Sequence, residues 1–303
     1  LFEVGPSPSA ACAAIRHPDF TQLSADTRVK AKAFMANHNQ RLLGGFLNIQ
    51  GGNYRGQLYT TSHHLGHGRL LAGGEFNVQQ FPSGIRALLH APFCHYVDIT
   101  ACFPSLLFAL RVGGNAFEEW STRPQEFYSE LASVYACEPQ VVKAILRPFL
   151  NRTWPAVVRS FRTAGLDILG CRRRLSLNSP LGNIRDDGLP TRLWEAHQAV
   201  SVANILSGCH MRDLQLRSHY DTTALLLQDI ESLFIFALSR ELQHRCGTEC
   251  VQAFVHDGLL VSNTVSMYTI LEVAADTSLE LFGTAINFHF EHWNDVISSK
   301  LPQ

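Results

Sequence analysis

The sequence predicts an α+β protein that combines a small antiparallel sheet with many helices. In the segment QAFVHDGLLVSN at 252–263, two apolar runs flank a His-Asp-Gly corner, which predicts two short strands joined by a tight turn. The segment HYVDITACFPSLLFALR at 95–111 predicts a buried strand that runs to Asp98 and is followed by an apolar helix. Residues 112–221 are largely helical by pattern, so helices are expected to dominate the middle of the chain.

Composition allows a sizeable core and argues against several classes of protein. The chain has 303 residues, 46% of them hydrophobic, which is enough for one large or two modest domains. Lys and Arg number 25 against 26 Asp and Glu, so any nucleic-acid-binding surface has to be local. No apolar run reaches the length of a membrane span and no signal peptide is visible, so no membrane partner is expected. The sequence begins at Leu1, which is compatible with an excerpt from a longer protein.

The cysteines and histidines favour an intracellular protein without a zinc site. Eight cysteines are scattered with no CxxC pair, and several lie in apolar surroundings, as is typical of reduced thiols. His63, His64 and His67 cluster, but no cysteine or carboxylate lies near them at zinc-ligand spacing. We therefore interpret this cluster as part of a polar loop.

The N-terminal segments are expected to be mainly irregular. Residues 1–24 are rich in Pro, Ser and Ala, residues 26–41 predict a surface helix, and residues 48–67 predict a loop and a hairpin. Residues 66–82 form a loop-like stretch with one arginine and several side-chain amides. Such groups can hydrogen-bond to sugars, phosphates or base edges, and a plain polar loop is the alternative.

The C-terminal segments predict regular structure. Pro104 is suited to the first turn of the helix that follows Asp98. Asp221 or Thr222 is expected to cap a long helix that runs to about Arg245. The hairpin comes next, followed by a helix at 268–282 and a last strand at 285–292 that ends near Trp293.

Two aspartates at strand ends are the main candidates for chemistry. Asp98 ends the first buried strand, and Asp257 lies at the corner of the hairpin. Two such carboxylates on adjacent strands could share divalent cations, an arrangement that activates a hydroxyl and neutralises phosphate charge in phosphoryl transfer. The alternatives are that Asp98 caps the following helix and that Asp257 belongs to an ordinary turn.

A local basic stretch lies between these two aspartates. Residues 140–174 contain one acidic residue, Asp167, and eight basic ones: Lys143, Arg147, Arg152, Arg159, Arg162, Arg172, Arg173 and Arg174. Positions 143, 147 and 151 share one helical face, although Pro148 can bend that helix. This stretch is suited to a triphosphate or a polynucleotide, and a solvated charged face is the alternative.

Several of these segments match known motifs in order and spacing. HGRL at 67–70 and NVQQFP at 77–82 are similar to the motif TGRLSS..PNLQNIP, and FVHD at 254–257 is similar to VHDE. Gln228 opens a long helix as the glutamine of an IQG motif does, and INFHF at 286–290 is similar to a closing strand. Over residues 66–295 the chain therefore resembles the polymerase module of family A DNA polymerases.

The resemblance implies roles for individual residues. Asp98 and Asp257 would be the catalytic carboxylates that hold two Mg²⁺ ions, with Mn²⁺ as an alternative cation. Lys143 and Arg147 would contact a nucleoside triphosphate. The residues that would contact primer or template are Arg69, Gln79, Gln80, Arg86, Gln228 and His256.

The chain also departs from family A. At 98–105 it has DITACFPS, which is closer to the DxxSLYPS motif of family B, where the aromatic residue excludes a ribose 2′-hydroxyl. Phe103 occupies that position, which implies a preference for deoxynucleotides, and core packing is the alternative role. Gly258 stands where family A often has Glu. About 65 residues precede the motif that contains Arg69, which is too few for a full thumb or an exonuclease domain, so the resemblance implies a compact polymerase of viral or mobile-element type.

The resulting hypothesis is a right-hand polymerase with an antiparallel-sheet palm and helical fingers. We expect an N-terminal segment at 1–65 with room only for a reduced thumb, palm at 66–110 and 222–303, and fingers at 111–221. The expected partners are a primer–template and nucleoside triphosphates, and the expected role is DNA replication. The alternatives are an RNA polymerase of the same palm type, a non-catalytic nucleic-acid-binding module, and an unrelated α+β domain.

Overall fold

The fold is described from a computed structural model, which is mostly helical with one four-stranded antiparallel open sheet. The α+β class predicted from the sequence is therefore confirmed. The residues described are 14–29, 31–32, 58–62, 67–72, 79, 82–91, 93–146, 149–151, 154–166, 189–217 and 219–291.

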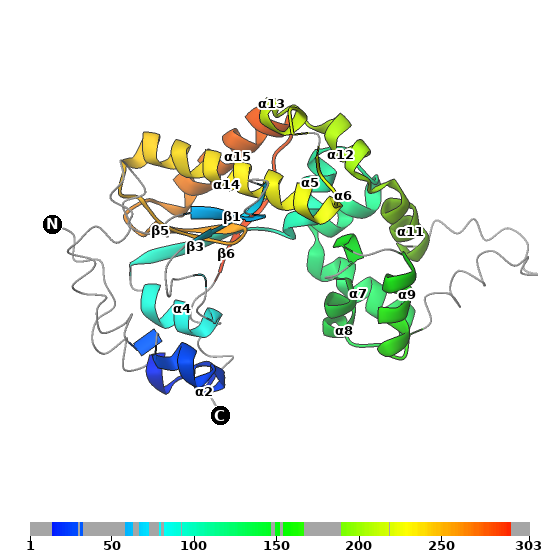
Figure 1. Ribbon diagram of the computed structural model, residues 1–303, viewed down its shortest axis with the longest axis horizontal. Coiled ribbons are helices and arrows are strands. Elements are labelled where there is room, and N and C mark those ends of the chain that lie inside the picture. The colour runs from blue at the N-terminus through cyan, green and yellow to red at the C-terminus, as the bar shows by residue number, and fades with distance from the viewer. Residues whose placement is uncertain are drawn as a thin grey trace, which may run out of the picture. The chain divides into compact units, whose positions relative to one another are not determined.

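The described elements follow one another as Figure 1 labels them. The strands are β1 (Leu58–Ser62), β2 (His67–Ala72), β3 (Cys94–Ile99), β4 (Val251–Val255), β5 (Gly258–Ser262) and β6 (Phe288–Phe290). The helices are α2 (Pro18–Gln22), α4 (Ser83–His90), α5 (Cys102–Ala109), α6 (Asn115–Thr122), α7 (Pro124–Tyr135), α8 (Pro139–Leu146), α9 (Trp154–Thr163), α11 (Leu189–Ala199), α12 (Val202–Gly208), α13 (Arg212–Gln215), α14 (Thr223–Cys246) and α15 (Met267–Phe282), with a short 3₁₀ turn at Phe149–Asn151.

The chain divides into two compact units. The first, which we call the sheet unit, comprises Leu1–Ile99, Ser232–Thr277 and Phe288–Gln303. The second, the helical unit, comprises Thr100–Glu231 and Ser278–Asn287. The long helices α14 and α15 each have residues in both units, so each unit is built from segments far apart in the sequence.

The sheet unit is built around β3. The strand order is β4-β5-β3-β6, and every neighbouring pair is antiparallel. On β3, Val97 pairs with Leu259 of β5 and with Phe290 of β6, and Asp98 pairs with Gly258 and His289. Because side chains alternate along a strand, these two rows of residues lie on opposite faces of the sheet.

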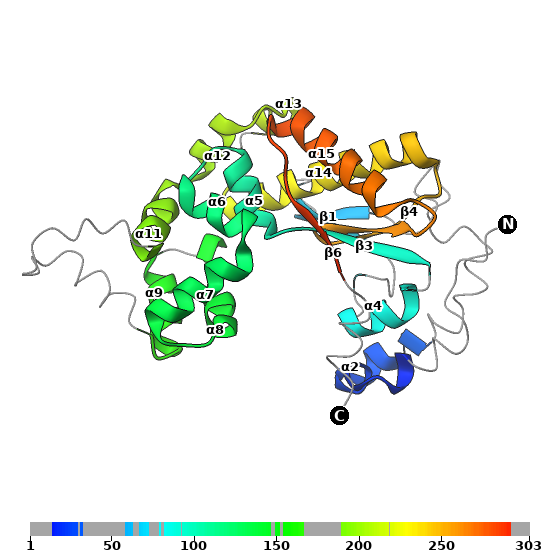
Figure 2. The same ribbon diagram turned by 180° about the vertical axis from the view of Figure 1, so that it is seen from behind.

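The two faces of this sheet are covered differently. Figures 1 and 2 show α14 and α15 on one face and α4 and α2 on the other. The face toward α14 is apolar, with Val97, Ile99 and Leu259 fully buried, and the ring of Phe234 lies 5.6 Å from that of Phe288. On the opposite face, a smaller buried cluster joins the sheet to α4 and the N-terminal helical residues: Ala14, Phe20, Ala31, Ile85, Ala87, Leu89, Cys94, Tyr96, Val255 and Leu260.

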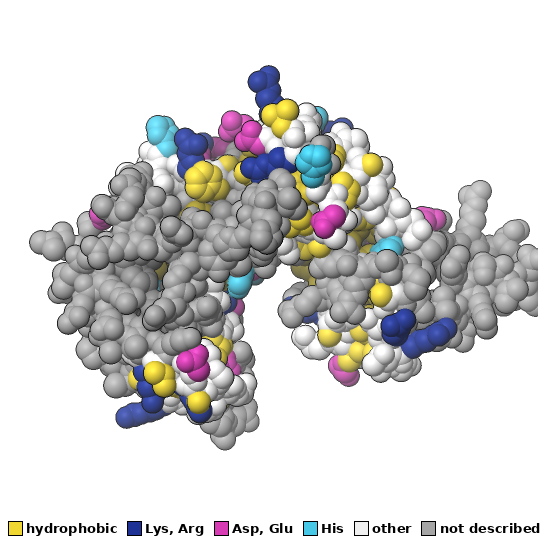
Figure 3. Space-filling view, viewed as in Figure 1, with side chains coloured by type: hydrophobic (Ala, Val, Ile, Leu, Met, Phe, Trp, Pro, Cys, Tyr) yellow, Lys and Arg dark blue, Asp and Glu magenta, His cyan; other side chains and the backbone are white. Residues whose placement is uncertain are grey.

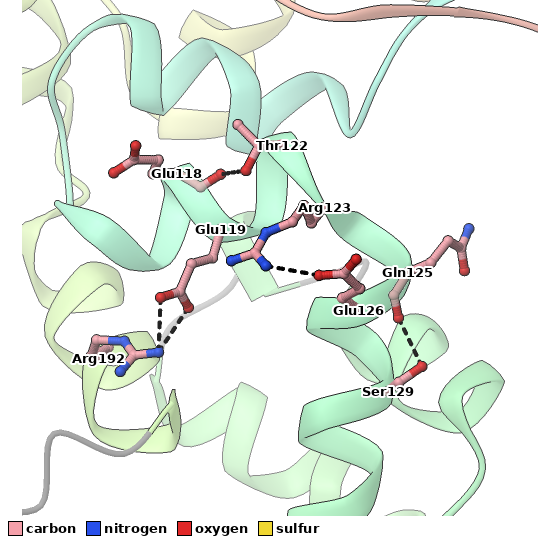
Figure 4. Close-up of polar contacts among 8 residues, drawn as sticks. All are labelled: Glu118, Glu119, Thr122, Arg123, Gln125, Glu126, Ser129 and Arg192. Atoms are coloured by element: carbon pink, nitrogen blue, oxygen red, sulfur yellow. Dashed lines mark hydrogen bonds and ion pairs between the residues drawn. The ribbon is translucent and has the colours of Figure 1, made fainter.

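The helical unit is held together by packed aromatic rings and by polar contacts between its helices. The rings of Trp120 and Phe127 stack with their centroids 5.1 Å apart, which joins α6 to α7. Figure 4 shows Arg192 of α11 beside Glu119 of α6, where one guanidinium nitrogen donates to both carboxylate oxygens at 2.8 and 3.0 Å. The α6–α11 contact therefore combines packing with an ion pair.

The sequence predicted a capped long helix, a proline in the first turn of another helix, and a last strand. The long helix is α14, and the Thr222 hydroxyl caps it by accepting a hydrogen bond from the Leu225 N–H at 3.1 Å. Pro104 lies in the first turn of α5, as predicted. The last strand is shorter than expected, because only Phe288–Phe290 pairs with β3. Residues 25–29 and 31–32 are helical, and the rest of the surface helix expected at 26–41 lies outside the described residues.

A buried carboxylate on α14 organises another part of the helical unit. Asp229 is 2% exposed, accepts a hydrogen bond from the Tyr220 hydroxyl at 2.6 Å and forms an ion pair with Arg217 at 2.9 Å. Burial, followed by the hydrogen bond to Asp229, raises the pKa of Tyr220. This cluster ties the start of α14 to the segment that follows α13.

We predict that Asp229→Asn lowers the free energy of unfolding by about 1–3 kcal/mol, because the hydrogen bonds from Tyr220 and Arg217 lose their charged acceptor in a buried place. Urea denaturation followed by circular dichroism measures the change. Glu119→Gln is the matched control, since both partners of its ion pair are about 30% exposed and the expected loss is below about 1 kcal/mol. Equal losses in the two variants would contradict the argument from burial.

Candidate active site

The β4–β5 hairpin turns through two residues, His256 and Asp257. Val255 ends β4 and pairs with Gly258, which begins β5. His256 has φ of 55°, the left-handed conformation that a two-residue hairpin requires at its first turn position. The tight turn predicted from the sequence is confirmed, but it is centred one residue earlier than the Asp-Gly pair. Asp257 is therefore at the tip and Gly258 already belongs to a strand.

Gly258 is required by its surroundings and not by its backbone conformation. A Cβ atom at this position would lie 2.5 Å from the Val97 carbonyl oxygen, 2.7 Å from Cε2 of Tyr96 and 3.1 Å from Oδ1 of Asp98. Glycine thus allows β3 and its side chains to approach the hairpin closely. The carboxylate of Asp98 lies directly over this glycine.

The two predicted catalytic aspartates come together at one end of the sheet. Asp98 pairs with Gly258, the residue after Asp257, and the Ile99 N–H donates to the Asp257 carbonyl oxygen at 3.2 Å. Both side chains are partly buried. The alternative that Asp98 caps the following helix is wrong, because Ala101 is the N-cap of α5 and no side chain caps that end.

Other polar residues share the sheet face with Asp98. Tyr96 is two residues earlier on β3, and the Glu291 N–H donates to its carbonyl oxygen at 3.0 Å. His289 pairs with Asp98 itself. From α4, the guanidinium carbon of Arg86 lies 5.9 Å from the centre of the Tyr96 ring. Of these residues only Arg86 was predicted; alternation along the expected last strand could have indicated His289 and Glu291.

The charges of this cluster act on the Tyr96 phenol. Burial is the main reason why the pKa of Tyr96 is raised, since the chain leaves this side chain only 6% exposed. The positive charge of Arg86 lowers the pKa of Tyr96. Three carboxylates raise the pKa of the phenol further, which shows that they are within electrostatic range of one atom: Asp98, Asp257 and Glu291.

The residues present fit a magnesium site that is completed by substrate. Mg²⁺ is commonly held in proteins by one or two carboxylates, with water and substrate phosphates as the other ligands. Asp98 and Asp257 match that requirement in number and type. Among the residues that the structure describes, no group of three or more His, Cys, Asp or Glu side chains is arranged to hold a metal ion by itself.

The remaining predicted contact residues lie in several places. In the sheet unit, Arg69 is on β2 and Gln79 is a buried residue of a short helical turn. In the helical unit, Lys143 is exposed on α8, Phe103 is partly buried in the first turn of α5, and Gln228 is partly buried on α14. Gln80 and Arg147 lie outside the described residues.

The basic stretch at 140–174 is described only in part. Lys143, Arg159 and Arg162 are exposed, on α8 and α9. Figure 3 shows basic side chains on the surface over these helices. The other five arginines of the stretch are not among the described residues. The exposed charges are available to an anionic ligand.

The helical unit also has an open pocket of about 520 Å³, between the ends of α5, α11, α12 and α15. Its polar lining includes Arg111, Asn204 and His210. None of the predicted nucleotide-binding residues lines it. This pocket is therefore separate from the predicted nucleotide contacts.

Comparisons with known proteins do not assign the chain to a family. No protein-family model matches the sequence, and no curated protein matches it. No helix in the described part of the chain is long and apolar enough to cross a membrane.

We predict that Gly258→Ala lowers the free energy of unfolding by about 1–3 kcal/mol, because the new methyl group collides with the Val97 carbonyl oxygen. His256→Gly is the control within the same turn. It removes the cost of a non-glycine residue at positive φ, so stability is expected to be unchanged or up to about 1 kcal/mol higher. Chemical denaturation of both variants measures the difference; a stable Gly258→Ala protein would contradict the close approach.

Proposed function

We propose that this protein is a template-dependent nucleic-acid polymerase that adds deoxynucleotides to a 3′ end. The observation that carries the proposal is the pairing of Asp98 on β3 with Gly258, which brings Asp98 beside the turn residue Asp257 that immediately precedes β5. The order of the polymerase-like segments along the chain is a second support.

The proposed reaction is attack of a primer 3′-hydroxyl on the α-phosphate of an incoming nucleotide, with pyrophosphate as leaving group. Asp98 and Asp257 would hold two Mg²⁺ ions, which when bound supply charge neutralisation and activation of the hydroxyl. Lys143 is exposed and would neutralise the triphosphate. Arg86, on the face of Asp98 and Tyr96, is a candidate for contact with the primer–template.

In this proposal the sheet unit serves as the palm and the helical unit provides the fingers. An open antiparallel sheet with carboxylates at its end suits the palm, and exposed basic side chains on α8 and α9 suit a unit that binds anionic substrates. None of the six described cysteines takes part in a disulfide, which supports the proposed intracellular setting: Cys94, Cys102, Cys137, Cys209, Cys246 and Cys250.

We expect Asp257→Asn to reduce primer extension by roughly 100-fold or more while the protein remains folded, because the amide cannot neutralise a cation. The assay uses a labelled primer on DNA and RNA templates with Mg²⁺, and Mn²⁺ binding is followed by the EPR signal of the free ion. Asp276→Asn is the control, since this exposed carboxylate on α15 forms an ion pair with Arg245 of α14 and is not part of the hairpin. Near-normal extension and Mn²⁺ binding by Asp257→Asn would refute the assignment.

Phe103→Ala tests the choice of sugar. If the ring excludes a 2′-hydroxyl, the variant should incorporate ribonucleotides about tenfold better relative to deoxynucleotides, equivalent to about 1.4 kcal/mol. Single-nucleotide incorporation with matched dNTP and rNTP measures the ratio. Wild-type protein that prefers ribonucleotides would favour the RNA polymerase alternative, whereas an unchanged ratio in the variant would leave Phe103 with a packing role.

A further inference from the structure

Tyr96 is a buried residue to which the proposed reaction assigns no role. It lies on β3 two residues before Asp98, on the same face of the sheet, and is only 6% exposed. Apolar residues could fill this place equally well if packing were the only requirement. Packing alone therefore does not account for the hydroxyl group of Tyr96.

The Tyr96 side chain contacts both ends of the hairpin turn that carries Asp257. Its hydroxyl donates a long hydrogen bond of 3.4 Å to the carbonyl oxygen of Val255, the residue immediately before the turn. Its ring lies against Gly258, the residue immediately after the turn, where Cε2 would be 2.7 Å from any Cβ. The contact thus extends from β3 across β5 to β4.

Residues outside the hairpin also hold Tyr96 in place. The Arg86 guanidinium of α4 lies over the ring, with its central carbon 5.9 Å from the ring centre. The backbone of Glu291 pairs with that of Tyr96 on the other edge of β3. A ring that lies against Gly258 and under the Arg86 guanidinium can transmit a fixed geometry to the residues it touches.

We infer that Tyr96 is a positioning residue that fixes Asp257 relative to Asp98 and thereby sets the affinity of the aspartate pair for a divalent cation. This inference rests on the proposed function, because it assumes that the pair binds metal. The ring supplies packing against Gly258, and the hydroxyl fixes the turn through Val255. Residues that orient metal ligands without touching the metal commonly change its affinity when they are substituted.

Tyr96→Phe tests the role of the hydroxyl, since it keeps the ring and removes one oxygen atom. We expect the folded variant to bind Mn²⁺ about three- to tenfold more weakly in an EPR titration, with a lower kcat and an unchanged KM for primer–template. p-Aminophenylalanine in place of Tyr96 restores a hydrogen-bond donor and should recover most of the Mn²⁺ affinity. A residue that acted only through packing would show neither effect.

Tyr220→Phe is the matched control, because it also removes a buried hydroxyl that donates to a protein oxygen, in the helical unit. Its Mn²⁺ affinity should equal that of the unsubstituted protein. Wild-type affinity in Tyr96→Phe, an equal loss in Tyr220→Phe, or no recovery with p-aminophenylalanine would overturn the inference. If Asp257→Asn itself binds Mn²⁺ normally, the proposed metal site fails; if Asp257→Asn loses binding while Tyr96→Phe does not, only the role of Tyr96 fails.

Discussion

The close approach of β3 to the β4–β5 hairpin is the constraint on which the candidate site depends. The register places Asp98 opposite Gly258, and no side chain larger than hydrogen fits at position 258. A shift of one residue in this register would turn Asp98 to the other face, where Val97 and Ile99 pack against apolar side chains. Burial of that apolar face therefore also determines which residues lie on the polar face, because the side chains of one strand point alternately to the two faces.

The two faces of the sheet therefore differ: one stabilises the fold and the other carries the candidate site. One face is apolar and is covered by α14 and α15, which supply the large buried surface that holds the strands together. The opposite face is apolar only toward α4 and ends in a cluster of charged and polar groups around Tyr96. Residues at the end of such a sheet are held by a rigid backbone while their side chains remain accessible, which is the requirement for a precise site.

The charge of this cluster has a physical consequence. Asp98, Asp257 and Glu291 each add negative charge near the Tyr96 phenol and raise its pKa. Arg86 supplies one positive charge from α4. Under the proposed function, a divalent cation held by Asp98 and Asp257 would add further positive charge to this cluster.

Local patterns in the sequence were sufficient for the elements of this fold. The apolar runs around His256 and Asp257 predicted the hairpin, and Thr222 predicted the start of α14, because turns and helix caps depend on neighbouring residues. The same patterns identified both strand-end aspartates as candidates. They did not reveal the roles of Tyr96 and Gly258, or that Glu291 and His289 lie on the face of Asp98. Those relations join residues far apart in the sequence; the hydrogen bond from Tyr96 to Val255, for example, spans 159 positions. They arise only when the burial of one sheet face selects a single register, which is a property of the tertiary structure.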